Sequence, residues 1–253
     1  MVTKNADNSS NNIMAMILAA GVGSRLKPWT DLHPKALALV NGKSLLQRNI
    51  EYLQRYGINK VVINVHHFAD QIIREIEKNK GWGSEIRISD ETANVLETGG
   101  GFLNAAPLLH NASLIVLLNV DILTDLNLTA IIGYHQEKKP LATLATTTRD
   151  TSRYFLFDEG NNLCGWRNVS TGEEKLSDAQ QNEPKTPKAF SGVHVIEPRI
   201  FDLIPQQGKF SMVDVYLSLM QQHTIKAFDH SETKFVDVGK PESLATAEIM
   251  FPV

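Results

Sequence analysis

Residues 15–28 read AMILAAGVGSRLKP, and this stretch decides the fold. Its apolar first six residues have the length of a buried strand, and a glycine-containing loop follows at once. Glycines allow backbone N–H groups to approach an oligophosphate, and Arg25 and Lys35 could neutralise its charge. Two glycines also suit an ordinary tight turn between a strand and a helix. The glycines alone therefore leave phosphate binding open.

Two common phosphate motifs can be tested against this region, and both fail. The dinucleotide fingerprint requires a third glycine at position 26, where helix and strand pack closely, but Leu26 is there. The P-loop requires a glycine five positions before Gly42, but Leu37 occupies that place. The loop after the first strand therefore belongs to neither class.

Short apolar runs alternate with amphipathic segments through the first half of the chain. This alternation predicts βαβ units around a mainly parallel sheet. The most apolar run, 113–120, suits a central strand that is covered on both faces. Expected strands are 15–20, 61–65, 85–89 and 113–120, and expected helices are 44–56, a segment around 72–76 that ends near Gly81, and 98–109.

The pattern changes after Leu141 to one that predicts a mixed β region. Residues 154–157 and 163–167 flank a turn with the sequence EGNN, which is typical of a hairpin. The polar run 171–188 contains two prolines and is expected to be a mobile loop. The remaining expected elements are strands at 141–148, 189–196, 225–228 and 234–238, a helix at 213–220, and a helix from Pro241.

Composition excludes several classes of protein. The chain has 253 residues, with 25 Lys and Arg against 28 Asp and Glu, so it offers no extended basic field for nucleic acid. No apolar stretch approaches the roughly 20 residues that cross a bilayer, so no membrane span is expected. The single cysteine, Cys164, favours a reducing cytoplasm. We expect a flexible leader at 1–12 and one domain at 13–253.

Residues 18–46 resemble a known family, the sugar-1-phosphate nucleotidylyltransferases. They match its opening signature LxxGxGxRLxPxTxxxPKxLxxVxGKPLL, with Ser44 in place of the usual proline. Four later motifs extend the resemblance over nearly the whole chain, and they are LETGGG at 96–101, NVD at 119–121, FSG at 190–192 and VDVG at 236–239. In length and in these motifs the chain is most similar to the short N-acetylmuramate-1-phosphate uridylyltransferase-like members.

The resemblance implies an α/β fold of the Rossmann-like (GT-A-like) kind, with helices on both faces of the central sheet. Residues 13–150 would form mainly the nucleotide-binding half and 151–253 mainly the sugar-binding half. The implied reaction transfers a nucleotidyl group from a nucleoside triphosphate to a sugar 1-phosphate and releases pyrophosphate. UTP and an N-acetylated hexose-type sugar 1-phosphate are the expected substrates. GTP with mannose or heptose 1-phosphate is the alternative.

The resemblance also assigns the residues that carry the reaction. Arg25 would hold the leaving pyrophosphate, and Lys35 the α-phosphate. Asp121 and Asp237 would bind Mg²⁺, since both are expected at strand ends. One departure is Val120, which stands where the family usually has glycine. The other expected nucleotide contacts are Ala20, Gly21, Gly23, Ser24, His66 and Gly99.

Four further residues are expected to contact the sugar phosphate, namely Glu97, Gly100, Arg167 and Gly192. Structural roles compete with several of these assignments. Residues 98–101 could be a plain flexible turn, Arg167 could be an exposed strand arginine where many relatives have lysine, and Asp121 could cap a turn. His66 and His67 would point to opposite faces of a strand end, which disfavours a shared metal.

A catalytically inactive regulatory subunit that binds a nucleotide-sugar is the rival from another functional class, because one fold can serve binding alone. Arg25, Lys35, Asp121 and Asp237 are all present, although a sensor could lose the metal carboxylates. Their joint presence favours the enzyme.

Overall fold

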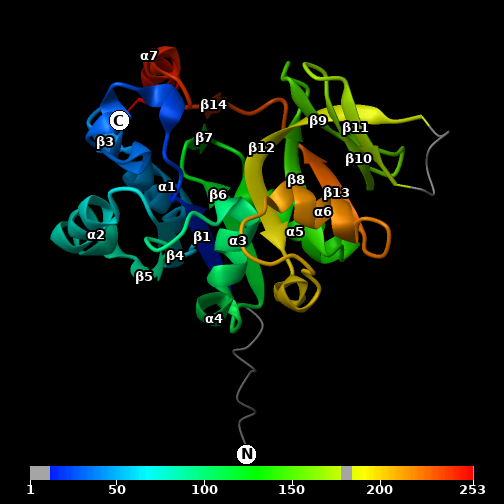
Figure 1. Cartoon of the computed structure of the whole chain (residues 1–253), viewed down its shortest axis with the longest axis horizontal. Helices are drawn as coiled ribbons and strands as arrows, with labels where there is room; N and C mark the ends of the chain where they lie inside the picture. The colour runs from blue at the N-terminus through cyan, green and yellow to red at the C-terminus, as the bar shows by residue number, and fades with distance from the viewer. Residues whose placement is uncertain (1–11, 178–183, 253) are drawn as a thin grey trace, which may run out of the picture.

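One ten-stranded sheet runs through the molecule, in the order β11-β10-β9-β12-β6-β1-β4-β5, with β8 and β13 joined to it through β12. The computed structural model describes residues 12–177 and 184–252 (Figure 1). The strands of the first half pair in parallel, as their alternation with helices predicted. They are β1 (Ile13–Leu18), β4 (Lys60–Val65), β5 (Glu85–Asp90) and β6 (Leu114–Asn119).

The second half makes the sheet mixed. Its longest strand, β12, is antiparallel to β6, β8 and β9 and therefore joins the two halves of the chain through one set of backbone hydrogen bonds. The expected hairpin is present as β9 and β10. These strands are β8 (Ala142–Thr147), β9 (Arg153–Phe157), β10 (Leu163–Asn168), β11 (Glu173–Leu176), β12 (Thr186–Ile196) and β13 (Ile225–Asp229).

Helices cover both faces of the sheet, and each face has its own apolar core. One core packs α1 (Leu45–Gln54), α2 (Ala69–Lys78) and α5 (Leu128–Lys138) on the strands. The other packs α3 (Glu97–Asn104), α4 (Ala106–Leu109) and α6 (Met212–Leu219) on the opposite face. This confirms the expected α/β class.

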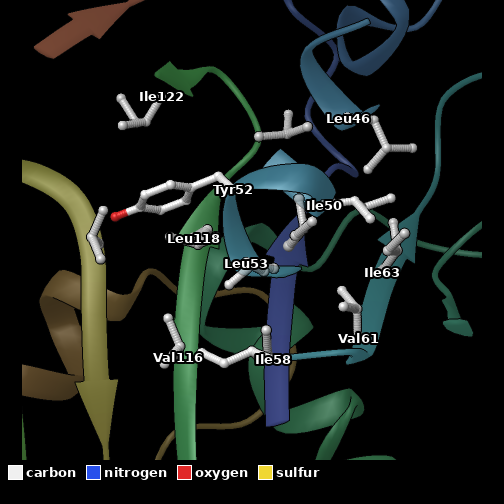
Figure 2. Close-up of a cluster of buried hydrophobic side chains, with 14 of the residues drawn as sticks. Leu46, Ile50, Tyr52, Leu53, Ile58, Val61, Ile63, Val116, Leu118 and Ile122 are labelled. Carbon is white, nitrogen blue, oxygen red and sulfur yellow. The ribbon is translucent and has the colours of Figure 1, made fainter. Parts of the chain in front are cut away.

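Helix α1 shows how the sequence forms this core. Ser44 precedes the helix, and its Oγ accepts a hydrogen bond of 3.0 Å from the backbone N–H of Gln47, which satisfies one of the free donors at the helix start. The helical spacing of Leu46, Ile50 and Leu53 places all three on the face toward β1, β4 and β6 (Figure 2).

A short ribbon outside the main sheet matters most for the site. Strand β7 (Ile122–Thr124) follows β6 after a turn, and it pairs antiparallel with β14 (Phe235–Asp237) from near the end of the chain. Helix α7 (Pro241–Met250) comes next and packs on the smaller ladder of β2 (Leu39–Val40) and β3 (Lys43–Ser44). Figure 1 shows β7 and β14 above the end of β6.

Two expectations about the chain need correction, and one helix was missed. The run 171–188 is not one loop, because 173–176 form β11 and Thr186 begins β12; residues 178–183 lie outside the described part. Strand β11 pairs with β10, and the start of β12 pairs with β9. This pairing outweighs the preference of a polar sequence for a loop. The expected helix 98–109 is two helices, divided at Ala105, and the second has a proline in its first turn. Helix α5 was not predicted.

The leader expected at 1–12 falls almost wholly outside the described residues, which begin at Asn12. In the described ranges, no helix combines the length and the apolar character that a membrane crossing requires.

Stability should decrease on acidification because of a buried histidine on β12. His194 shares a 2.6 Å hydrogen bond with the Tyr216 hydroxyl, and burial lowers the pKa of His194 to about 3. Below about pH 6.5 the His194 imidazole takes up a proton in the unfolded chain, whereas in the folded protein it stays neutral at these pH values. The His194 contribution therefore falls by about 2 kcal/mol from pH 7 to pH 5.

Urea unfolding at the two pH values measures this effect. His194→Gln should remove about that much of the pH dependence, whatever its effect on stability at pH 7. His110→Gln, at an exposed site, is the control and should leave the pH dependence unchanged. An equal pH dependence in wild type and His194→Gln would contradict the assignment.

Candidate active site

A cavity of about 530 Å³ opens at the carboxyl ends of the parallel strands β1, β4 and β6. Open α/β sheets bind ligands at this edge, at the point where the order of the strands reverses. The cavity is lined by Leu18, Ala20, Gly21, Val22, Gly23, Ser24, Arg25, Lys35, Asn64, Val95, Glu97, Thr98, Asn119, Val120, Asp121, Lys209, Ser211 and Gly239. Most of the residues predicted for the nucleotide and the chemistry are in this set.

The glycine loop forms one wall of the cavity. Gly23 has a φ of 64°, and a side chain there would come within 3.0 Å of Lys35 Cβ, so the loop requires glycine at this position. The Thr30 hydroxyl donates a 3.0 Å hydrogen bond to the Gly23 carbonyl. Among the described residues, the N–H groups of Gly21, Val22 and Gly23 have no acceptor. They are available to phosphate oxygens.

Lys35 is the buried cation of the site. It begins a short 3₁₀ turn, Lys35–Leu37, and its side chain is only 10% exposed. Its ammonium group forms an ion pair and hydrogen bond with the carboxylate of Asp121. A buried charge requires such a partner. The pair therefore keeps a cation and a carboxylate together inside the cavity.

The β7/β14 ribbon brings Asp121 and Asp237 together. The N–H of Val238 donates a 2.8 Å hydrogen bond to the Asp121 carbonyl, and Asp237 pairs with Ile122 in the ladder. Two carboxylates 116 positions apart (237 − 121) thus lie on neighbouring backbones. This arrangement is what the two-aspartate metal assignment requires.

Asp237 lies at the centre of a group of charges. Burial raises its pKa, and the nearby negative charge of Asp121 raises it further. The positive charges of Lys35, Arg25 and Arg149 act in the opposite direction. Arg25 also borders Gly239, because a side chain at Gly239 would come within 2.9 Å of its Nη2 atom.

The donor set fits a divalent cation. Asp237 Oδ1 is buried without a hydrogen-bond partner in the described structure, and the like charge of Asp121 is close to it. A cation would satisfy both conditions, and carboxylate oxygens suit Mg²⁺. Within the described ranges, no three His, Cys, Asp or Glu side chains form a metal-binding cluster. Asp121 and Asp237 are two, the number that commonly holds a phosphate-bound Mg²⁺.

Helix α3 forms the facing wall and carries Glu97. This residue has a φ of 60°, a strained backbone for a residue with a side chain, and such strain is concentrated at functional sites. Lys209 Nζ lies 3.5 Å from Glu97 Oε1, and both residues line the cavity.

The expected role of Gly99 and Gly100 needs a different physical basis. The N–H groups in the first turn of a helix are commonly free to bind a ligand, but both of these groups donate to the Phe210 carbonyl, at 2.9 and 3.1 Å. A side chain at Gly99 would lie 2.5 Å from the Phe210 ring. Their bare backbones therefore pack against the chain itself. Contact of these glycines with substrate stays a prediction.

Besides Gly99, Gly100 and Asp237, three predicted residues lie outside the cavity lining. His66 lies directly after β4, and its Nδ1 donates a 2.7 Å hydrogen bond to the Glu91 carbonyl. Arg167, on β10, forms an ion pair with Glu174 of β11. Gly192 has a φ of 72° and lies so close to Asn119, which lines the cavity, that a side chain would come within 2.9 Å of it. Their substrate roles stay predictions.

Sequence reasoning missed a buried polar chain behind the loop. Asn64 Oδ1 accepts a 2.7 Å hydrogen bond from the Ala19 N–H, and its Nδ2 donates a 2.7 Å bond to Glu91 Oε1. Burial raises the pKa of Glu91. The available signal was an asparagine within the apolar run 61–65. Asn64 fixes the point at which the glycine loop leaves β1.

A loop of free N–H groups, two cations and two carboxylates at the edge of a parallel sheet defines a protein that binds nucleotide phosphates. The family model described as Nucleotidyl transferase matches residues 14–250, and the chain belongs to that family. It is a nucleotidyltransferase.

Curated relatives match almost end to end. The N-acetylmuramate alpha-1-phosphate uridylyltransferase of Neisseria meningitidis is 30% identical over 93% of this chain and 97% of its own length. The enzyme of the same name from Caulobacter vibrioides is 29% identical over 93% of this chain and 95% of its own. The crystal structure of HddC from Yersinia pseudotuberculosis complexed with GMP-PN has a TM-score of 0.75 at 23% identity, covering 94% of this chain and 99% of that one. The last likeness concerns the fold.

Removing either cation of the cavity should reduce turnover. Lys35→Ala and Arg25→Ala should each lower kcat by about two orders of magnitude, the effect of losing a preorganised charged donor. Lys27→Ala is the matched control, because Lys27 lies in the same loop but is exposed and paired with Asp31 at 2.8 Å. Steady-state pyrophosphate release measures all three. Wild-type rates in the folded Lys35 and Arg25 variants would refute their assignment to the triphosphate.

Proposed function

We propose that the protein transfers a uridylyl group from UTP to the 1-phosphate of an N-acetylated hexose-type sugar, giving a nucleotide-sugar and pyrophosphate. The observation that carries the proposal is the joint placement of Lys35, Asp121 and Asp237 beside a loop with free N–H groups. The relatives that match almost end to end carry a name with this activity.

The arrangement suits an in-line displacement at phosphorus. An oxygen of the sugar phosphate forms a bond to the α-phosphorus of UTP as the bond to the bridging oxygen of pyrophosphate breaks. Such a reaction requires positioning and charge neutralisation, without a histidine base. Arg25 and the loop N–H groups would hold the leaving β- and γ-phosphates. Lys35 would neutralise the α-phosphate as its charge increases.

We further propose that the divalent cation is Mg²⁺, held by Asp121 and Asp237. When bound, the ion would supply positive charge to the phosphate oxygens of the substrates. The protein contributes the two carboxylates on the ribbon and the buried Lys35 beside them.

We assign the nucleotide mainly to residues 13–150 and the sugar mainly to 151–253 of a single domain. Glu97, Gly100, Arg167 and Gly192 remain the proposed contacts to the sugar phosphate, and His66 and Gly99 remain proposed contacts to the nucleotide. We propose a cytoplasmic location, which fits this activity. It also fits the buried free thiol of Cys164, because free thiols persist in a reducing compartment.

Guanylyl transfer is the second candidate. A mannose-1-phosphate guanylyltransferase catalytic subunit of Drosophila melanogaster is 25% identical, although this chain spans only 63% of its length. An inactive regulatory subunit is disfavoured, because Arg25, Lys35 and Asp121 line one cavity and Asp237 lies beside Asp121 on the paired strand β14.

A substrate screen tests the reaction. Purified protein is assayed for pyrophosphate release with UTP, GTP, CTP and ATP, each with N-acetylmuramate, N-acetylglucosamine, glucose, mannose and heptose 1-phosphates. We expect kcat/KM with UTP to exceed that with GTP by at least about tenfold, since a wrong base leaves polar groups of the site unpaired. Turnover with GTP and a mannose or heptose phosphate, but not with UTP, would establish guanylyl transfer instead. Nucleotide-sugar binding without turnover would favour the regulatory subunit.

Removing either aspartate charge should separate metal binding from structure. Asp121→Asn and Asp237→Asn should each shift the Mg²⁺ requirement to much higher concentration and lower turnover. Because the pKa of Asp237 is raised in the fold, its charged form destabilises the folded protein above that pKa. Asp237→Asn should therefore keep or increase the melting temperature at pH 7, whereas loss of a turn cap would cost about 1 kcal/mol.

Magnesium titrations of activity and thermal melts measure these effects. Asp70→Asn is the control, at an exposed carboxylate paired with Arg74. Normal turnover of both site variants at low Mg²⁺ would contradict the metal assignment.

A further inference from the structure

Arg149, two residues after the end of β8, is the one cation near Asp237 that the proposed reaction leaves without a role. Its Nη2 donates a 3.0 Å hydrogen bond to the Phe190 carbonyl. Its guanidinium carbon lies 5.0 Å from the centre of the Phe235 ring, a cation–π contact. Two different strands therefore fix the side chain, and little conformational entropy remains to be lost when it binds a ligand.

The charge of Arg149 has no carboxylate in direct contact. In the described part of the chain, Arg149 forms no ion pair within 4.0 Å, its Nε is buried without an acceptor, and Asp237 is the carboxylate whose charge acts on it from a distance. Burial lowers its pKa. A partly buried guanidinium without an anion destabilises the folded protein. An anionic ligand would remove that cost.

Unsatisfied polar atoms collect at this place. Only six buried side-chain polar atoms in the described structure lack a partner, and three of them belong to Thr147, Arg149 and Asp237. Thr147 ends β8 two positions before Arg149, and Asp237 lies two residues after Phe235, whose ring Arg149 contacts. A donor and two oxygens without partners are suited to a polar ligand.

The run 235–239, which begins as β14, indicates where this ligand would lie. Arg149 packs over Phe235, Asp237 follows two residues later, and Arg25 borders Gly239 after two more. Four residues separate Phe235 from Gly239, so the two arginines border points at most roughly 13 Å apart along the chain, with Asp237 between them. Arg25 lies beside the glycine loop, whereas Arg149 bonds to Phe190, two residues before Gly192.

We infer that Arg149 binds the phosphate of the sugar 1-phosphate and positions it for attack. The inference rests on the proposed function. Arg167, the cation expected from the sequence for this phosphate, already pairs with Glu174. A sugar 1-phosphate carries up to two negative charges. Because it would lie near the carboxylates of Asp121 and Asp237, it requires a cation in addition to the two assigned to the triphosphate. A guanidinium has the planar donor geometry that phosphate favours.

Kinetics and binding of single variants test the inference. Arg149→Gln should raise KM for the sugar 1-phosphate by at least about tenfold and leave KM for the nucleoside triphosphate within about twofold. Arg149→Lys should recover part of the loss. Arg153→Gln, at a nearby exposed position on β9, is the matched control and should match wild type in both constants.

The assay uses whichever substrate pair gives the highest wild-type turnover, so that a wrong base or sugar in the proposed function is recognised in the wild type alone. Calorimetric titration with the same sugar 1-phosphate gives a readout independent of turnover, and Arg149→Gln should weaken binding at least tenfold. Arg167→Gln is compared in parallel. An unchanged sugar 1-phosphate KM and affinity in a folded Arg149→Gln protein would overturn the inference, as would an equal rise of both KM values. A loss confined to Arg167→Gln would return the role to Arg167.

Discussion

The site depends on one short antiparallel ribbon. Strands β7 and β14 pair over only three residues each, and the Val238 N–H reaches the Asp121 carbonyl at 2.8 Å. This pairing places two carboxylates side by side, although like charges repel, and Lys35, Arg25 and Arg149 compensate them. The ribbon is therefore held together partly by charges from elsewhere in the chain. Strand β6 supports it from below, because it positions Asp121 directly.

The large sheet provides the rigidity that this arrangement requires. Strands β1, β4 and β6 are buried on both faces, and α1 packs across them through Leu46, Ile50 and Leu53. Their carboxyl ends then project loops whose first residues are held in place, as Asn64 holds Ala19. Positional precision at the phosphates thus comes from apolar packing some distance away. Hydrogen bonds such as the one from the Ala19 N–H to Asn64 then extend this positional precision to the loop.

The parallel half was predicted well from the sequence, because the spacing of the apolar residues and the turn residues that bound each run agree there. Runs such as 61–65 are both apolar and bounded by turn residues, and the signature at 18–46 fixes the order of loop and helix. Strand β11 was missed because its pairing with β10 is a tertiary contact that a polar run such as EEKL does not reveal. The roles of Asn64 and Arg149 were missed for the same reason. Each depends on a neighbour 25 or more positions away.

The glycines of α3 have a consequence for how the cavity can deform. Each glycine in a helix interior costs about 1 kcal/mol relative to alanine, and the eight residues of α3 include three in succession. The helix therefore depends on its docking with 208–211, where the Phe210 carbonyl accepts from both Gly99 and Gly100. Glu97 and Thr98 on one side and Lys209 and Ser211 on the other line the cavity. We therefore expect the two segments to open together, as one cooperative unit. A deformation of the cavity would then move this wall as a block, while Asn64 ties the start of the glycine loop to the sheet.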